Sequence, residues 1–199
     1  MNNFFTGFPG MDQLKTQYLK HPGKPVHIVN GHIHSPYSFS AFSNLEEAFL
    51  MAQEENIKVL GLNDFFTTEG YREFHDLSLK FKIFPLFNIE FMGLMKEQQE
   101  KGIRINDPGN PGRVYFSGKG LDFPVKENSS IVGRLIQLRE AGQKQTAGML
   151  EKSSSLLCSL DPRLKLDYSE VIRDYTRGML RERHIARAIR CKILEMFHT

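Results

Sequence analysis

Three segments in the first half of the chain have the hydrophobic pattern of β-strands. Residues 26–34 begin with alternating apolar and polar side chains, the period-two pattern of a half-buried strand. Residues 57–64 and 82–91 are apolar runs with a carboxylate at or near the end, and helical spacing separates the strands at about 44–56 and 68–80. This alternation is typical of a parallel sheet with right-handed crossovers, so it predicts an α/β fold.

The remaining segments differ in composition. Turn-forming Gly and Pro are frequent in residues 1–25, which we expect to form an N-terminal arm ahead of one β/α domain, residues 26–199. Residues 98–124 are rich in Gly, Pro and Asn and predict loops around a short strand at 114–116. The helical pattern returns later, over residues 129–152, from Asp167 or Ser169 onward, and over about 180–197.

Polar residues with metal-binding chemistry stand at the ends of the three expected strands. His32 and His34 are two apart in a strand, so their side chains project from one face. Asp64 and Glu90 follow at the ends of the second and third strands. Because chemistry gathers at the C-terminal ends of parallel strands, we expect these divalent-metal ligands to converge. The alternative is structural: histidines that hydrogen-bond at a strand end, a helix-capping Asp64 and a paired Glu90.

Composition narrows the class of protein. The 199-residue chain has a net charge of +3, which does not favour a generic nucleic-acid binder. No apolar run is long enough to cross a bilayer, and the first residues lack the pattern of a secretory signal. Cys158 and Cys191 lie far apart and in no Cys-x-x-Cys pair, so we expect no disulfide framework and a reducing, cytoplasmic location.

Five motifs follow one another from about residue 26 to the end of the chain. They are Asn30–Ser38 (Asn-Gly-His-Ile-His-Ser-Pro-Tyr-Ser), Leu60–Asp64, Thr67–Tyr71, Asn88–Glu90 and Arg183–Ile189. In this order and spacing they resemble the PHP (polymerase and histidinol phosphatase) superfamily, in its small phosphoesterase branch. The resemblance implies a distorted (β/α)7-type barrel that holds zinc, manganese or iron ions. It also implies hydrolysis of a phosphate-bearing small molecule by metal-activated water.

Residue roles also follow from the resemblance, position by position. Glu90 or Asp64 is the implied base towards a metal-activated water. His184 matches a histidine placed near the substrate, and the charge of the neighbouring Arg183 leads us to expect that the two residues together bind the substrate phosphate. The implied metal ligands are His32, His34, Glu90 and Asp64.

The chain departs from the family pattern at several ligand positions. Asn30 and Phe39 stand where the family usually has Asp, Phe65 stands where it has a His ligand, and a further His ligand aligns with Tyr115. Phenylalanine has no lone pair for a metal, and tyrosine binds one only as a phenolate, against an ordinary pKa of about 10. We therefore expect one or two ions at most, or none.

The C-terminal part of the family pattern is missing as well. Family members continue beyond the motif at Arg183 into strands with further ligands, whereas this sequence stops at Thr199. We therefore expect a partial barrel. Either the chain is a fragment, or its open sheet edges are covered by the arm, by a second copy or by the remainder of a longer chain.

Three hypotheses for the function remain open at this point. The first is a metal-dependent phosphoesterase with a depleted ligand set. The second is a catalytically inactive PHP-like domain whose aromatic pocket binds a ligand or partner. The third is nucleic-acid binding, which we expect least, because basic helix faces usually pair in solvent, here with Asp174 and Glu182. It rests on the helically spaced Arg173, Arg177, Arg181, Arg183, Arg187 and Arg190.

Overall fold

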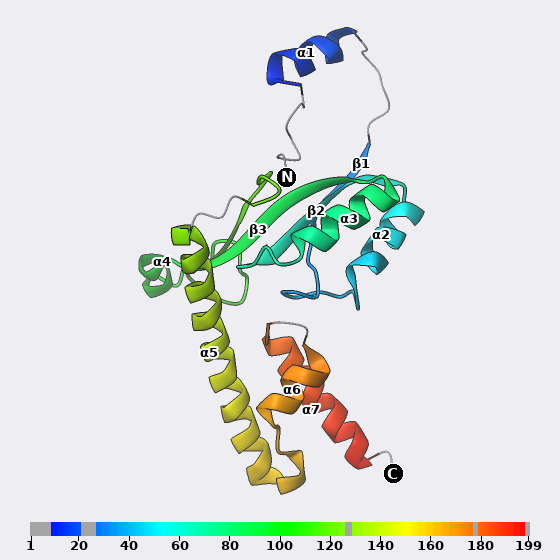
Figure 1. Cartoon of the computed structure of the whole chain (residues 1–199). Helices are drawn as coiled ribbons and strands as arrows, with labels where there is room; N and C mark the ends of the chain where they lie inside the picture. The colour runs from blue at the N-terminus through cyan, green and yellow to red at the C-terminus, as the bar shows by residue number, and fades with distance from the viewer. Residues whose placement is uncertain (1–8, 21–26, 126–128, 177–178, 198–199) are drawn as a thin grey trace.

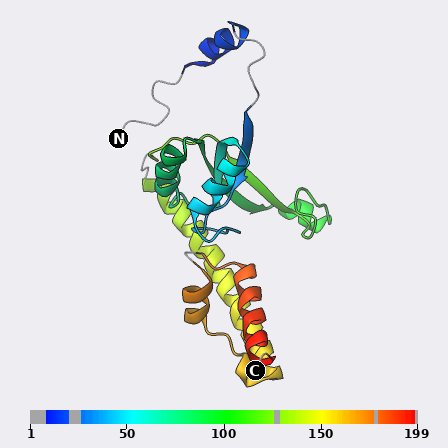
Figure 2. The ribbon, with the colours of Figure 1, turned by 90° about the vertical axis from the view of Figure 1, so that its right-hand side faces the viewer.

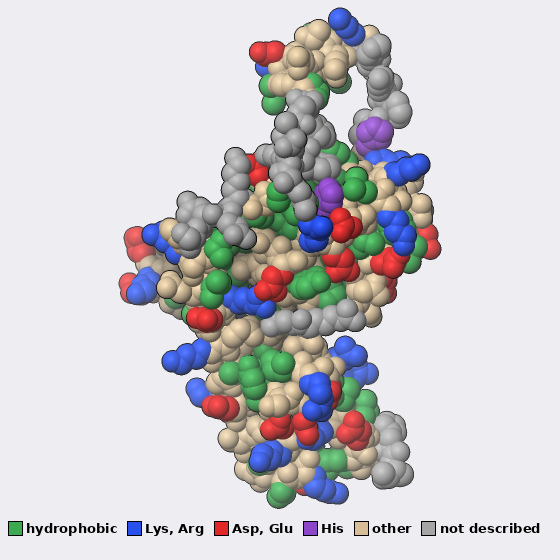
Figure 3. All heavy atoms as spheres, viewed as in Figure 1, with side chains coloured by type: hydrophobic (Ala, Val, Ile, Leu, Met, Phe, Trp, Pro, Cys, Tyr) green, Lys and Arg blue, Asp and Glu red, His purple; other side chains and the backbone are tan. Residues whose placement is uncertain are grey.

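The structure is a computed structural model, and it describes residues 9–20, 27–125, 129–176 and 179–197. Residues 27–125 form a sheet unit, and the later described residues form a helical unit; the two meet at a narrow waist (Figures 1 and 3). Helix α1 (Met11–Lys20) lies apart from both and has no buried residue. None of the described helices has both the length and the apolar character of a membrane span. The expected boundary at residue 25 stays a prediction.

The sheet confirms the predicted parallel order. Its strand order is β1-β2-β3-β4, and the first three strands are parallel to their neighbours. Strand β4 is antiparallel to β3, because β3 continues past the expected end and folds back through a hairpin with the short helix α4 at its tip (Figure 2). The bounds are β1 (Ile28–Ile33), β2 (Ile57–Phe65), β3 (Phe84–Leu94), α4 (Lys96–Glu100) and β4 (Arg113–Gly118).

Two helices, α2 (Leu45–Glu54) and α3 (Tyr71–Phe81), cover one face of this curled sheet. The predicted start of α2 is confirmed, because the Asn44 side chain accepts a hydrogen bond from the Glu47 main-chain N–H at 2.9 Å. The core between sheet and helices is built from fully buried aromatic and aliphatic side chains. They include Leu45, Phe49, Leu60, Leu62, Phe74 and Phe87.

The helical unit is a hairpin of a long helix with two shorter ones beside it (Figures 1 and 2). The long helix continues past its predicted end at Lys152, because Ser154 Oγ accepts from the Leu166 N–H at 2.9 Å and donates to the Leu166 carbonyl at 3.0 Å. These two hydrogen bonds satisfy the serine hydroxyl, so that a serine can occupy a buried position of the helix. The elements are α5 (Ser129–Leu160), the 3-10 turn η1 (Pro162–Leu164), α6 (Tyr168–Tyr175) and α7 (Glu182–Phe197).

The helical unit docks at the C-terminal ends of the strands. Met179, just ahead of α7, packs in one buried cluster with Phe65 and Phe66 at the end of β2. Arg183 Nη1 donates a hydrogen bond to the Ser40 carbonyl at 3.0 Å. The end of β2 is therefore covered by the helical unit, whereas the side chain of His32 at the end of β1 stays 48% exposed.

Gly61 allows β1 and β2 to approach closely, and this sets the position of His32. A Cβ at residue 61 would lie 2.5 Å from the Gly31 carbonyl oxygen, which is backbone and cannot turn aside. We expect Gly61→Ala to lower the free energy of unfolding by about 3 kcal/mol, measured by urea unfolding. Gly31→Ala is the matched control, since nothing lies within 4 Å of its Cβ position. Equal losses in the two variants would contradict the steric explanation.

Candidate metal centre

His32, His34 and Glu90 converge as the strand pattern predicts. His32 Nε2 lies 3.2 Å from His34 Nε2, and Glu90 Oε2 lies 3.0 Å from the first nitrogen and 3.3 Å from the second. The histidines come from the end of β1 and the loop after it, and the carboxylate comes from β3. Within the described residues these three form the one group of at least three such side chains that could hold a metal ion.

The geometry of this triangle fits a divalent ion. Ligand atoms at about 2.0–2.1 Å from zinc lie roughly 3–3.5 Å from one another, and the three edges here fall in that range. Glu90 Oε2 is buried and makes no hydrogen bond within the described part of the chain. The two imidazole nitrogens lie within reach of this oxygen, and a cation between the three atoms would satisfy the buried carboxylate. The residues present therefore fit a metal ion.

The protonation states favour metal binding. Burial, together with the neighbouring charges of His32, Arg181 and Arg183, lowers the pKa of His34 to about 4. The His34 imidazole is therefore neutral at pH 7, so a ring nitrogen can offer its lone pair to a metal. Burial raises the pKa of Glu90, and the charges of His32, Lys119 and Arg181 oppose that rise.

Asp64 occupies a different place from the three converging ligands. Its Oδ1 accepts from the Ser35 main-chain N–H at 2.7 Å and from Ser38 Oγ at 2.8 Å, and its Oδ2 accepts from Ser35 Oγ at 2.5 Å. Burial raises its pKa to about 6. Asp64 therefore ties the loop after β1 to the end of β2, and it is not part of the group formed by the two histidines and Glu90. Its role as ligand or base stays a prediction.

Aromatic rings stand around His34. Phe65 stacks on the imidazole, with centroids 5.0 Å apart and planes at 7°, and Phe39 meets it edge-on at 5.6 Å. The ring centroid of Tyr115 lies 6.1 Å from that of Phe65. In the sheet register Phe65 is the β2 partner of Glu90. Three positions that differ from the family pattern therefore lie together beside the candidate metal ligands.

Arg183 and His184 line a neighbouring hollow of about 580 Å³, formed by the loop after β1 and by α6 and α7. Arg173 and Arg187 line it too. The Arg183 guanidinium carbon lies 3.6 Å from the centre of the Phe39 ring, so this arginine borders both the hollow and the aromatic rings. Burial and the arginines nearby lower the pKa of His184. The two expected substrate contacts thus lie in one basic hollow.

The arginines on and next to the last two helices are partly paired with neighbouring carboxylates. Arg173 is bonded to Asp174 at 2.8 and 2.9 Å, and Arg181 Nε lies 3.5 Å from Glu182, which confirms the expected pairings. Arg177 lies outside the described residues. Charged side chains of both signs alternate over the face seen in Figure 3. No continuous basic surface is visible in that view.

Two cations lie beside the centre at positions that the sequence did not predict, although Arg181 was expected on a basic helix face. Lys119 Nζ donates to the Gly31 carbonyl and to Asn63 Oδ1, both at 3.1 Å, and its charge acts on Glu90. Arg181 lies over Phe65, with its guanidinium carbon 4.8 Å from the ring centre. Lys119 lies in the Gly/Pro-rich segment, which carries no periodic pattern. Arg181 was noted in the sequence only as one of the helically spaced arginines, and that spacing does not reveal its position beside the centre.

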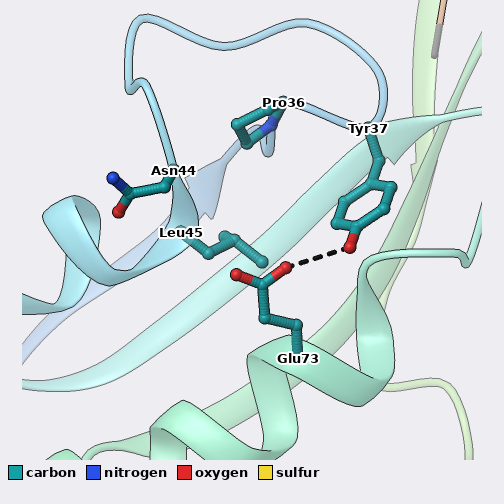
Figure 4. A pocket seen from close by; sticks show the side chains of 5 residues that line it. All are labelled: Pro36, Tyr37, Asn44, Leu45 and Glu73. Atoms are coloured by element: carbon teal, nitrogen blue, oxygen red, sulfur yellow. Dashed lines mark hydrogen bonds between the residues drawn. The ribbon is translucent and has the colours of Figure 1, made fainter. Parts of the chain in front are cut away.

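A smaller hollow, of about 280 Å³, lies behind the loop after β1 (Figure 4). Its lining includes Tyr37, whose hydroxyl donates to Glu73 Oε2 on α3 at 3.1 Å. None of the three candidate metal ligands lines it. The Tyr37–Glu73 bond therefore gives the loop after β1 a second attachment, to α3, besides its hydrogen bonds to Asp64.

Comparison with known proteins identifies solved structures that share the fold of this chain. No family model matches the sequence, and no curated protein matches it. Solved structures do match. One is a protein from Bifidobacterium adolescentis, proposed to be a metal-dependent phosphoesterase, with TM-score 0.60 and 15% identity over 85% of this chain and 52% of that one. Another is an amidohydrolase from Chromobacterium violaceum, whose structure holds sulfate and no metal, with TM-score 0.59 and 18% identity over 86% and 51%.

The chain has the fold of these two structures. At 15% and 18% identity this similarity concerns the fold, and it confirms the α/β partial barrel expected from the motifs. The chain spans about half the length of these two proteins. His32, His34 and Glu90 meet at the C-terminal ends of parallel strands, which is the edge where active sites of β/α barrels generally lie.

Proposed function

We propose that this chain is a metal-dependent hydrolase of phosphate esters that uses one divalent ion. The observation that supports it most is the triangle of His32, His34 and Glu90, whose buried carboxylate oxygen lies 3.0 and 3.3 Å from the two imidazole nitrogens. Two imidazoles and one carboxylate suit zinc, manganese or iron. A bound ion of this kind activates water and neutralises phosphate charge.

The surrounding residues support phosphate as the group recognised. Arg183 and His184 would contact the phosphate oxygens, since they line the basic hollow beside the triangle. Bidentate hydrogen bonding by arginine matches phosphate geometry.

The second candidate function is a binding module without catalysis. It is favoured by Phe39 and Phe65, whose rings occupy positions where the family has metal ligands and pack against His34. Neither ring can hold a second ion. A chain of this kind would bind an anionic ligand through the same arginines and leave it intact.

Assays of phosphate-ester hydrolysis distinguish the metal-dependent hydrolase from the binding module without catalysis. We would assay mono- and diesters of p-nitrophenol with Zn²⁺, Mn²⁺ or Fe²⁺, on wild type and on Glu90→Gln. The proposal predicts metal-dependent hydrolysis that Glu90→Gln abolishes. Hydrolysis that persists in Glu90→Gln, or no hydrolysis by a protein that has bound metal, would contradict it, and the second result would favour the binding module.

A further inference from the structure

Arg181 stands beside the candidate metal centre, and the proposed function has given it no role. Its guanidinium carbon lies 4.8 Å from the ring centre of Phe65 and 5.7 Å from that of Phe39. Phe65 in turn stacks on His34 and neighbours Glu90 in the sheet. The positive charge of Arg181 acts on both ligands, and it favours neutral His34 and ionised Glu90.

The side chain is largely buried but incompletely satisfied. It is 13% exposed, and its Nε makes no hydrogen bond within the described residues. Its Nε lies 3.5 Å from a carboxylate oxygen of Glu182, and that side chain is half exposed. A buried guanidinium with an open N–H is costly unless an anion meets it.

The main chain around Arg181 holds it in place. The Leu180 N–H donates to Gln143 Oε1 at 2.8 Å, and Gln143 Nε2 donates back to the Leu180 carbonyl at 3.2 Å. The Arg181 N–H donates to His184 Nδ1 at 3.1 Å. Together with the aromatic rings beneath the guanidinium, these bonds fix the position of the cation before any ligand arrives.

We propose that Arg181 is an oxyanion-binding residue of this centre, which holds a phosphoryl group next to His32, His34 and Glu90. The inference rests on the proposed function for its substrate class. A fixed cation at this place has two opposite effects. It attracts a phosphate anion by charge and hydrogen bonding, and it repels the divalent ion that the triangle binds.

Two separate titrations test Arg181, one with inorganic phosphate on the metal-free protein and one with Zn²⁺ in the absence of phosphate. For Arg181→Gln we expect phosphate binding to weaken by about tenfold or more and Zn²⁺ binding to tighten by roughly three- to tenfold at low salt. Arg181→Lys keeps the charge, so it should retain the wild-type Zn²⁺ affinity and part of the phosphate affinity. Arg190→Gln removes the same charge from an exposed position on α7 and should change neither.

The outcomes are distinct. Unchanged phosphate binding in Arg181→Gln overturns the inference, and so does weakening of both phosphate and Zn²⁺, which would indicate a structural role. If the wild type binds phosphate through Arg181 but takes up no Zn²⁺ or Mn²⁺, the metal-dependent function fails and the anion site stands.

Discussion

Glu90→Gln is expected to weaken Zn²⁺ binding by more than about 100-fold, because loss of even an outer-shell partner costs 10–100-fold in metal affinity. The metal-free variant should be at least as stable as wild type. Glu90 Oε2 is buried beside the imidazoles of His32 and His34 and makes no well-aligned hydrogen bond, so a neutral amide removes the cost of burying a charge there. Calorimetric titration measures the first effect, and thermal unfolding of the metal-free protein measures the second.

Glu97→Gln on α4 is the matched control, because this glutamate is exposed and pairs with Lys101 on the surface. It should leave both quantities unchanged. If Glu90→Gln instead destabilised the metal-free protein, the carboxylate would have a structural role, in agreement with the alternative reading of Glu90 as a paired group.

Asp64→Ala is expected to lower the free energy of unfolding by about 3 kcal/mol and the Tm by roughly 6–12 °C. The substitution leaves three donors in the loop after β1 without their acceptor, and two of them come from Ser35, which is fully buried. Asp64→Asn should lower the free energy of unfolding much less, because the amide oxygen still accepts hydrogen bonds from the Ser35 N–H and from Ser38 Oγ.

Asp76→Ala serves as the control for this effect. Asp76 is 61% exposed on α3 and forms surface pairs with Arg72 and His75, so its loss should cost under about 1 kcal/mol. Urea unfolding monitored by circular dichroism compares the variants. A loss in Asp64→Ala no larger than that in Asp76→Ala would mean that the loop holds its place without the Asp64 hydrogen bonds.

Much of the sheet unit could be predicted from local pattern. The apolar spacing around Phe49 and the polar cap at Asn44 define α2 from the sequence, and both depend on near neighbours in the chain. The reversal of β4 could not be predicted, because a Gly/Pro-rich segment carries no periodicity that sets strand direction. The extension of α5 also depended on a distant partner, the Leu166 main chain that satisfies Ser154.

The candidate site likewise contains residues that the sequence predicts and residues that only the tertiary structure places there. His32, His34 and Glu90 were predictable because strand periodicity and parallel order fix which ends and faces meet. Asp64 stands at an equivalent strand end, but its partners are serines in the loop after β1, and sequence spacing does not reveal that contact. Arg181 reaches the centre from a separate helical unit, so only tertiary structure places it there.

Metal content tests the central claim most directly. Elemental mass spectrometry would be applied to protein purified without chelator and then loaded with Zn²⁺ or Mn²⁺, for wild type, His34→Ala and the control His75→Ala, whose histidine lies outside the triangle. We predict about one ion per chain in wild type and in His75→Ala, and loss of that ion in His34→Ala. No stoichiometric metal in wild type after loading, or an equal amount in His34→Ala, would contradict a metal centre built on His32, His34 and Glu90.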